Sequence, residues 1–409
     1  MKYVIRIVPT LLLLCAASWA NSQTTVIRNI HLITGSENRV IRDAQVVVQG
    51  RIIQQIGKTG DPIPSGATVI DGQGYYLMPG LIDCHTHIDN LAAAQRALHS
   101  GVTTYRTAGV SAFQDVALGE LSRTGKIAGP DVIAAGTFVT PQLGETILGD
   151  LRYSELIGGV QTDEELRKIV RINIERGAKV IKTRGTERAG LPETDPRKQV
   201  YTEHQLRVIV EEAALKGIPV MVHAHGDEGA RAAVLAGARS IEHGTFLSDE
   251  TLQLMKERGT FLVLTYITLE DLTKPGGDYS NPTLELRGRY MMPIGEKVFR
   301  KALSLGVKIA TGADNDYAPH STSRIALECE HYVRMGMTPF QAIQSATTVA
   351  ADLLMVATTT GRIQSGLEAD MILLPGNPLE DIRVLQDVLM VVSNGQIALL
   401  RIPFGKEQK

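Results

Sequence analysis

The sequence predicts an α/β fold: a (β/α)8 barrel (a TIM barrel) over residues 79–357, with a small β-sandwich domain built from both chain ends. The first observation is a repeated alternation between apolar, β-branched runs and amphipathic stretches of helical periodicity, which is typical of a parallel barrel. The second is that residues 23–78 and 358–409 contain only short strand patterns between turn residues. We therefore expect the two end segments to pair with each other beside the barrel.

Residues 1–22 have the pattern of a signal peptide and are excluded from the fold. Lys2 and Arg6 form a positively charged start, and an apolar run too short to span a membrane follows them. Small residues allow cleavage after Ala20, and cleavage after Ser22 is the second option. The alternatives are an uncleaved anchor or a buried first strand. With cleavage, we expect a periplasmic or secreted protein without a membrane anchor.

Eight barrel strands are predicted, each from an apolar run. Their expected first residues are Leu81, Gly101, Asp131, Lys179, Pro219, Arg239, Thr260 and Val307. The clearest helices between them cover residues 162–176, 202–216, 227–236 and 248–258. Thr162 and Thr202 each precede a Glu or Gln by three positions, which is the capping box that begins a helix. A glycine directly follows each of the four ranges, as is common where helices end.

The last part of the barrel needs separate predictions. Residues 268–300 contain Pro275-Gly276-Gly277, so we predict a long segment that covers the barrel mouth as a lid or substrate loop. Residues 321–335 and 339–355 have helical periodicity and follow the eighth strand.

Residues that can bind metal ions stand at the ends of predicted strands, where barrel enzymes place their active sites. His85 and His87 end the first strand, and because they are two positions apart they face the same side. His223 and His225 end the fifth strand in the same way, and His243 ends the sixth. Imidazole nitrogens at these positions suit a divalent metal ion.

Two further strand ends carry groups of opposite charge. Asp314 follows the eighth strand, and Lys182 lies near the end of the fourth. A protonated lysine repels metal ions, whereas a lysine carbamylated by carbon dioxide is an anion whose two oxygens can bridge two ions. Taken alone, Lys182 is more simply a surface or substrate-binding lysine. Cys84 directly precedes His85, so its side chain points to the opposite side of the strand, away from the barrel mouth. We therefore expect Cys84 to pack in the protein interior.

This arrangement resembles the amidohydrolase superfamily, and the resemblance covers nearly all of the chain after residue 22. Residues 78–87, Met-Pro-Gly-Leu-Ile-Asp-Cys-His-Thr-His, look like its opening motif, and residues 366–374 look like the stretch that re-enters the β-sandwich. The most specific feature of this resemblance is the order in which the candidate ligands occur along the chain: His-x-His, Lys, His, His, Asp. Residues 241–244 and 337–343 are similar to the branch of imidazolonepropionase-like enzymes and exported Xaa-Pro dipeptidases, and ochratoxin-hydrolysing N-acyl amino acid amidases are similar too.

The resemblance implies a binuclear, metal-dependent hydrolase that cleaves the amide C–N bond of dipeptides or N-acyl amino acids. His85, His87 and Asp314 would hold one divalent ion, His223 and His243 the other, and carbamylated Lys182 would bridge the two. Ligands of nitrogen and oxygen without thiolate favour Zn²⁺ and also suit Mn²⁺ or Co²⁺. Asp314 is the expected catalytic residue, which moves a proton from the attacking hydroxide to the leaving amine. His225 is the alternative to His223 as a ligand.

The substrate contacts are less specified. Arg184 and Tyr266 are candidates for binding a substrate carboxylate, although a surface Arg and a packed Tyr are equally good interpretations. His225 and His320 are further substrate candidates. Residues 137–143 contain no histidine, whereas that branch often has a Gly-Gly-His stretch here, and this difference concerns the specificity rather than the metal chemistry.

Other functions on the same fold stay open. A lactonase, a cyclic amidase or an imidazolone-type hydrolase would use a similar centre. Lys182 argues against a single-metal deaminase, because those branches lack a bridging lysine. A non-catalytic binding protein is less expected, because all six ligand residues are present.

The composition bears on partners. The chain has 42 Lys and Arg against 44 Asp and Glu, a formal net charge of -2. This composition lacks the excess of positive charge that is typical of proteins that bind nucleic acid or an anionic membrane. Once Cys15 leaves with the signal peptide, two cysteines allow one disulfide and imply no disulfide framework. We expect a small-molecule substrate and, by analogy of fold alone, a homo-oligomer.

Overall fold

The computed structural model describes residues 23–275, 279–321 and 324–402. The predicted signal peptide, residues 1–22, lies outside the described residues, and so do Gly276 and Gly277 of the predicted lid. Across the described residues, none of the helices combines the length and the apolar character that crossing a membrane requires.

Eight parallel strands make up the barrel, in hydrogen-bonded series β5-β6-β7 and β8-β9-β10-β11-β12. Their bounds are β5 Leu81–Thr86, β6 Val102–Thr107, β7 Asp131–Ile133, β8 Ile181–Arg184, β9 Val220–Gly226, β10 Ser240–Phe246, β11 Phe261–Val263 and β12 Ile309–Ala310. Each strand begins within two residues of its predicted start.

Backbone hydrogen bonds join the two series on both sides. The amide of Val139 donates to the carbonyl of Lys182 at 2.9 Å, which links the end of β7 to β8. The amides of Cys84 and Asp314 bond the carbonyls of Thr311 and His85 at 3.0 and 2.7 Å, which links β5 to the end of β12. The strands therefore form a ring, and the predicted fold class is confirmed.

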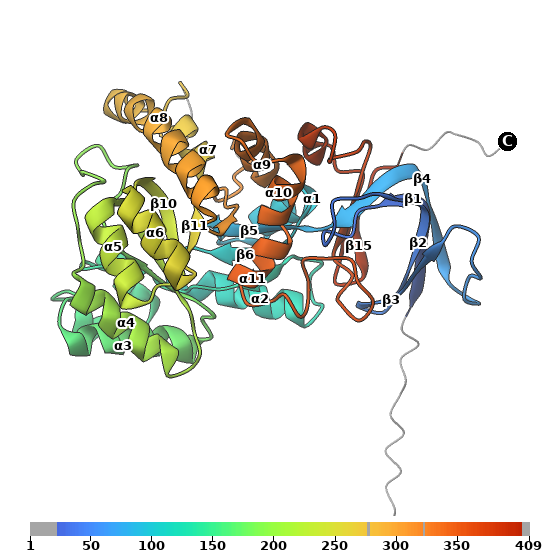
Figure 1. The fold of residues 1–409 in the computed structure, drawn as a ribbon. Coiled ribbons are helices and arrows are strands. Elements are labelled where there is room, and N and C mark those ends of the chain that lie inside the picture. The colour runs from blue at the N-terminus through green and yellow to red at the C-terminus, as the bar shows by residue number, and fades with distance from the viewer. Residues whose placement is uncertain (1–22, 276–278, 322–323, 403–409) are drawn as a thin grey trace, which may run out of the picture.

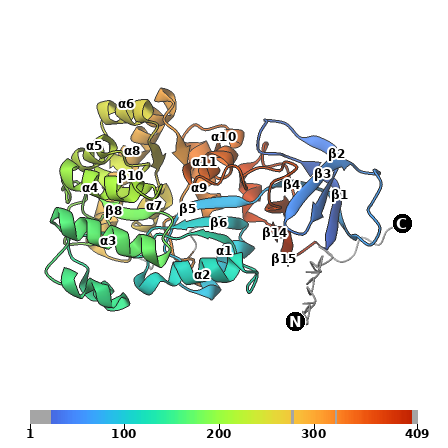
Figure 2. The same ribbon diagram turned by 90° about the horizontal axis from the view of Figure 1, so that it is seen from below.

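The predicted helices surround the strands (Figure 2). They are α3 Asp163–Arg176, α4 Glu203–Ala214, α5 Asp227–Ala236 and α6 Asp249–Arg258, and α1 Leu91–His99 and α2 Gln114–Arg123 precede them. Both capping boxes form, with Thr162 and Glu165 at α3 and with Thr202 and Gln205 at α4. Gly177 then ends α3 at φ 108°, a left-handed conformation that glycine adopts without strain.

The segment predicted as a lid or substrate loop is instead largely helical. It contains α7 Tyr266–Asp271 and the 24-residue α8 Pro282–Leu305. The Asn281 side chain caps the amides of Thr283 and Leu284, and Pro282 occupies the first turn, where its missing N–H costs nothing. The segment is thus helical rather than a loop. Five of its described residues line the cavity at the carboxyl ends of the strands, where the prediction placed the segment: Thr268, Leu269, Asp271, Leu272 and Tyr279.

The helices after the barrel differ from the prediction at one point. α9 spans Ile325–Arg334, and the helix predicted over residues 339–355 is two helices, α10 Pro339–Ser345 and α11 Thr348–Leu353. Thr347 between them has φ -138° and ψ -93°, which is not helical. Its hydroxyl donates to the Ile343 carbonyl at 2.7 Å, an example of a side chain competing for helical backbone groups.

Both chain ends form one seven-stranded sheet, seen at the right of Figure 1 where blue and red strands lie together. Its order is β15 Gln396–Leu400, β14 Met390–Ser393, β13 Met371–Leu374, β4 Thr68–Pro79, β1 Thr24–Leu32, β2 Ile41–Gln49 and β3 Ile52–Lys58. The ends meet where β13 pairs antiparallel with β4, Met371 opposite Pro79. A separate apolar core that includes Leu32, Val46 and Leu373 packs this sheet.

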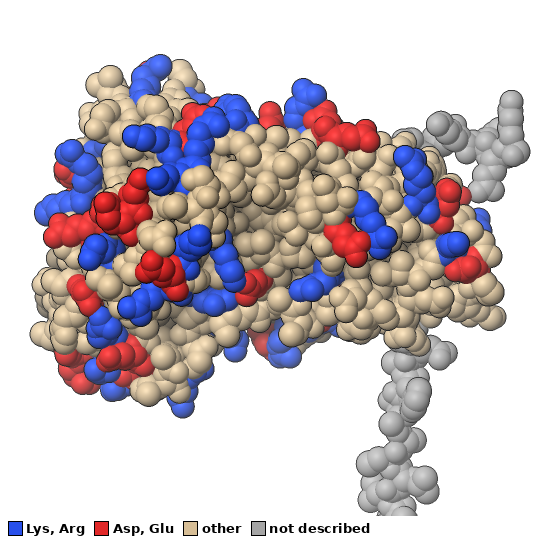
Figure 3. All heavy atoms as spheres, viewed as in Figure 1, with Lys and Arg blue, Asp and Glu red and all other residues tan. Residues whose placement is uncertain are grey.

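Two other expectations concern cysteines and charge. Cys84 and Cys329 are buried and free, so the disulfide that the sequence allowed is not formed, and Cys84 packs as predicted. On the face shown in Figure 3, Lys and Arg side chains are interspersed with Asp and Glu.

Candidate metal centre

The carboxyl ends of the barrel strands surround one cavity of about 670 Å³. The structure brings all six predicted metal ligands into its lining: His85, His87, Lys182, His223, His243 and Asp314. The predicted substrate residues His225 and His320 line the same cavity. Side chains from residue 85 to residue 320 thus meet at one place, as expected for a site built on the ends of parallel strands.

The first donor group consists of His85, His87 and Asp314. The Nε2 atoms of His85 and His87 lie 3.3 and 3.2 Å from Oδ1 of Asp314. The Nδ1 of His85 bonds the Glu242 carboxylate at 2.7 Å, and that of His87 bonds the Gly109 carbonyl at 3.1 Å. These acceptors hold a proton on Nδ1 of each ring and leave its Nε2 facing Oδ1 of Asp314.

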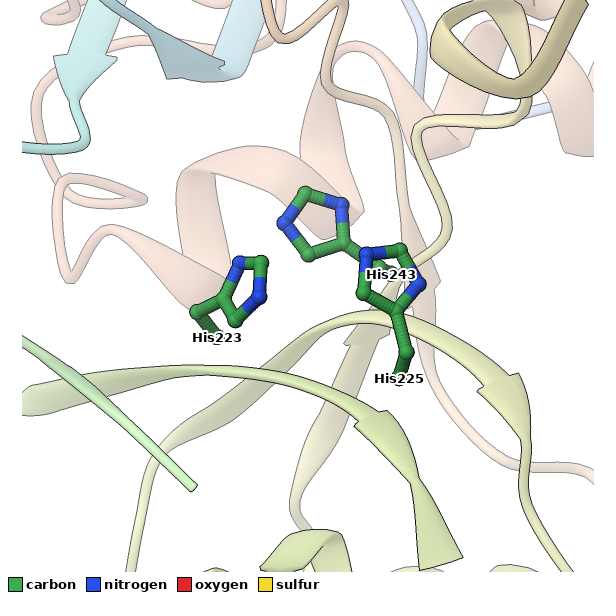
Figure 4. Close-up of side chains that lie close together, drawn as sticks. All are labelled: His223, His225 and His243. Atoms are coloured by element: carbon green, nitrogen blue, oxygen red, sulfur yellow. The ribbon is translucent and has the colours of Figure 1, made fainter. Parts of the chain in front are cut away.

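The second donor group consists of His223, His225 and His243, whose rings face a shared space (Figure 4). One nitrogen from each lies within 4.8 Å of the others. The His225 and His243 rings are stacked with centroids 4.6 Å apart, and His223 meets His243 edge-on at 4.5 Å. The structure therefore places His225, predicted as a substrate contact and as the alternative ligand to His223, beside the two predicted ligands.

Hydrogen bonds occupy one nitrogen on each of these rings and leave the other available. Nε2 of His223 bonds the Glu187 carbonyl at 3.0 Å, so its proton lies there and Nδ1 carries the lone pair. Nδ1 of His225 and of His243 bond the Thr245 and Thr265 hydroxyls at 2.9 and 2.7 Å. An imidazole held at one nitrogen and open at the other is the usual state of a metal-binding histidine.

The protonation of the site fits a divalent cation. Burial is the main reason that the pKa of His85 falls to about 4 and that of His225 to about 3, while the pKa values of His223 and His243 fall well below 6.5. Burial alone would raise the pKa of Asp314, but His85 and His87 outweigh it and the carboxylate stays ionised. Buried histidines with lowered pKa values and an ionised carboxylate are donors suited to a divalent cation.

Lys182 lines the same cavity as the two donor groups. Its side chain is 2% exposed, and its Nζ is 3.4 Å from Nε2 of His85. Burial lowers the pKa of Lys182 from 10.5 to about 7, although Glu242 and Asp314 oppose the shift. A substantial fraction of this amine is therefore neutral near pH 7, and the neutral amine is the form that reacts with carbon dioxide.

Residues 76–398 match the amidohydrolase family. The chain belongs to this family. It is 31% identical to the ochratoxinase of Aspergillus niger over 417 aligned positions, which cover 91% of this chain and 86% of that protein. The resemblance predicted from the strand-end motifs is thereby confirmed, and the chain is a hydrolase that acts on carbon–nitrogen bonds.

Solved structures agree with this assignment. A Xaa-Pro dipeptidase with bound methionine in its active site superposes with a TM-score of 0.83 at 32% identity, covering 92% of this chain and 99% of that chain. A prolidase complexed with N-methylphosphonate-L-proline superposes with a TM-score of 0.81 at 28% identity, covering 92% and 99%.

This amidohydrolase also has a buried network behind His85 that the sequence analysis missed. Glu242 is fully buried, and besides His85 it binds the guanidinium of Arg106 at 2.8 Å. Arg106 is 2% exposed and also donates to the Cys84 carbonyl at 2.6 Å. Burial would raise the pKa of Glu242, but Arg106 and His85 lower it to about 2. The carboxylate is therefore ionised and holds the His85 ring in one orientation.

The backbone of this amidohydrolase is unusual at three residues of the site. His243, Thr265 and Asp314 have φ values of 73°, 52° and 48°, in the left-handed region that residues other than glycine rarely adopt. Such conformations persist only where the surrounding structure holds them. The ring of strands thus holds His243 and Asp314 in positions that the local chain alone would disfavour.

The predicted carboxylate contacts do not lie in the cavity lining. Arg184 is partly buried, and its guanidinium stacks 4.7 Å from the centroid of the Phe138 ring. Tyr266 is 2% exposed and packs edge-on against His331 with ring centroids 5.2 Å apart. Arg188, which sequence reasoning did not select, is exposed and lines the cavity instead. Because Arg188 lies beyond the end of β8, alternation along the strand gave no signal for it.

Proposed function

We propose that this amidohydrolase hydrolyses the amide bond of dipeptides or N-acyl amino acids with two divalent metal ions, Zn²⁺ being favoured. One observation carries the proposal: two groups of donors, one with His85 and the other with His223 and His243, face one cavity together with the buried Lys182. A single ion would not need a second group of buried donors. The names of similar proteins support the substrate class, because they include a dipeptidase, a prolidase and an ochratoxinase.

In this proposal His85, His87 and Asp314 hold one ion, and His223 and His243 hold the other. Lys182, carbamylated through its neutral amine, would supply an oxygen to each. His223 is the proposed strand-β9 ligand because the Glu187 carbonyl fixes its proton on Nε2 and frees Nδ1. His225 is left to face the substrate, in reach of the same cavity.

When bound, the ions would supply Lewis acidity that polarises the scissile carbonyl and favours attack by water near neutral pH. The chain's own residues carry the proton. Asp314 is ionised, 11% exposed, and its Oδ2 accepts from the Thr268 hydroxyl at 3.3 Å, so it is oriented to accept a proton from the attacking water. It would then pass that proton to the leaving amine nitrogen. Enclosure of the site by buried histidines strengthens each of these interactions by excluding water.

The first experiment is hydrolysis of a mixed library of dipeptides and N-acyl amino acids by the zinc-loaded protein and by Lys182→Ala prepared identically. We expect turnover by the wild type and a loss of at least about 1,000-fold in the variant, because the bridging ligand is gone. Turnover that survives Lys182→Ala would contradict the proposed centre. Absence of turnover by a fully metallated wild type would overturn the substrate class and direct the assay to lactones and cyclic amides.

We also propose that the protein is exported, since residues 1–22 have the composition of a signal peptide. Amino-terminal sequencing of the protein purified from its native cells should begin at Asn21 or Gln23. A chain that begins at Met1 would contradict this proposal.

A further inference from the structure

Three basic side chains surround the Phe138 ring on the wall of the cavity. Nζ of Lys182 lies 5.6 Å from the ring centroid, and the guanidinium carbons of Arg184 and Arg188 lie 4.7 and 5.5 Å from it. These are cation–π distances. Within residues 23–275, 279–321 and 324–402, no carboxylate forms an ion pair with any of the three. The two guanidinium groups of Arg184 and Arg188 therefore keep positive charge on this wall without a direct ion pair.

The three side chains differ in what a bound molecule can reach. Lys182 is buried beside His85. Arg184 does not line the cavity, and its buried Nε has no hydrogen-bond partner. Arg184 therefore adds positive charge behind the Phe138 ring, where a molecule in the cavity does not reach it. Arg188 is exposed and lines the cavity, and of the three it is the guanidinium open to a ligand.

The loop that carries Arg188 is held in place from two sides. On one side, the carbonyl of the preceding residue, Glu187, is bonded by the candidate ligand His223 at 3.0 Å. On the other, Arg287 of α8 donates to the carbonyls of Ala189 and Thr194 at 2.5 and 2.6 Å, and also to those of Leu191 and Pro192. Because the loop backbone is already fixed, it loses little conformational entropy when the guanidinium of Arg188 binds a ligand.

We propose that Arg188 binds the free α-carboxylate of the amino-acid half of the substrate. This inference rests on the proposed function and narrows it: amides that carry a carboxylate beside the scissile bond are selected over those that lack one. A guanidinium matches a carboxylate with two parallel, charge-assisted hydrogen bonds. Leu191, Leu269 and Leu272 line the same cavity and suit an apolar side chain on that amino acid.

The test uses two substrates that differ only in the carboxylate, N-acetylphenylalanine and N-acetylphenethylamine. We expect the wild type to prefer the first by about 10- to 100-fold in kcat/KM, the range for a hydrogen-bonded charge pair. Arg188→Met should remove this preference by raising KM for the carboxylate substrate, and should change kcat/KM for the amine derivative less than about twofold. Arg188→Lys should restore part of the preference, because it keeps the charge.

The matched control is Arg197→Met in the same loop. Arg197 is exposed, pairs with Asp195 at 2.9 Å and does not line the cavity, so its loss should leave the preference unchanged. Calorimetry with the products adds a readout without turnover: Arg188→Met should weaken binding of phenylalanine about tenfold and leave phenethylamine unchanged. Equal wild-type activity on both substrates, or equal losses on both in Arg188→Met, would overturn the inference.

The two proposals fail in different ways. If no N-acyl amino acid is hydrolysed by the metallated wild type, the proposed function is wrong, and product binding decides the role of Arg188. If hydrolysis occurs but phenylalanine and phenethylamine bind equally well to wild type and variant, the proposed function stands and the carboxylate site is wrong.

Discussion

Donor atoms converge both at the barrel mouth and beside the seven-stranded sheet. At the mouth they belong to His223, His225 and His243, and beside the sheet to Asp131, Glu368 and Asp370. In each group the atoms lie within 4.8 Å of one another. In the acidic cluster of the latter three residues, Arg51 pairs with Glu368 at 3.1 Å, and Asp370 accepts from the Asn394 amide at 2.8 Å and the Thr360 hydroxyl at 2.7 Å. Its carboxylates therefore already have a cation and donors.

The histidine cluster has no such compensation. Its hydrogen bonds occupy one nitrogen of each ring and leave the other facing a cavity. The acidic cluster does not line that cavity. Instead, Asp131 of β7 accepts a hydrogen bond at 3.1 Å from the side-chain amide of Asn394, which lies between β14 and β15. Convergence of donors alone thus does not distinguish a reactive site from a structural one; the partners of the donors and access from solvent do.

The largest expected effect separates the two clusters directly. His243→Ala should lower kcat/KM by at least about 1,000-fold and remove metal ions from the protein, because it deletes a ligand. Asp370→Asn should leave both within about threefold, since the acidic cluster is not in the site. Steady-state kinetics and elemental analysis of the two purified variants measure this. An active His243→Ala protein, or loss of metal from Asp370→Asn, would reverse the roles given to the clusters.

A smaller effect is expected from Glu242, which touches the metal site only through His85. Glu242→Gln keeps the size of the side chain but removes the charge that fixes the His85 ring, so metal affinity should fall about 10- to 100-fold. Competition with a chelator measures the affinity. Added zinc should then restore kcat, a rescue that a generally destabilised protein would not show. Unchanged affinity would mean that the β5 strand positions His85 without Glu242.

The same contrast explains how much could be predicted from the sequence. The positions of the eight strands and of six cavity residues followed from local patterns: apolar runs, alternation along a strand, and polar residues at its end. The pairing of Glu242 with Arg106 joins residues 136 positions apart, and nothing local signals it. Arg188 was not predicted, because alternation holds along a strand but gives no signal in the loop after it. The resemblance to the family identified the role of Lys182, which its own surroundings in the sequence did not.

The smallest effect tests whether the acidic cluster is structural through its protonation. Burial, with help from Asp131, raises the pKa of Asp370 to about 7, against the opposing bonds from Asn394 and Thr360. The folded protein therefore binds a proton that the unfolded chain releases near pH 4, so this carboxyl lowers stability as the pH rises from about 4 to about 7. Asp370→Asn removes that dependence. The difference in the free energy of unfolding, variant minus wild type, should therefore increase by about 2 kcal/mol from pH 5 to pH 8. This is roughly half of the full linkage value, because Asp131 and Glu368 share the proton.

Denaturant unfolding of both proteins at several pH values measures this difference, with the exposed Asp387→Asn as a control that should follow the wild type. Parallel curves for Asp370→Asn and wild type would mean that Asp370 is ionised in the folded protein. Three ionised carboxylates would then face the single guanidinium of Arg51, an excess of negative charge that calls for a further cation. In that outcome the acidic cluster would resemble the histidine cluster after all, and metal analysis of the protein loaded with Ca²⁺ or Mn²⁺ would become the next measurement.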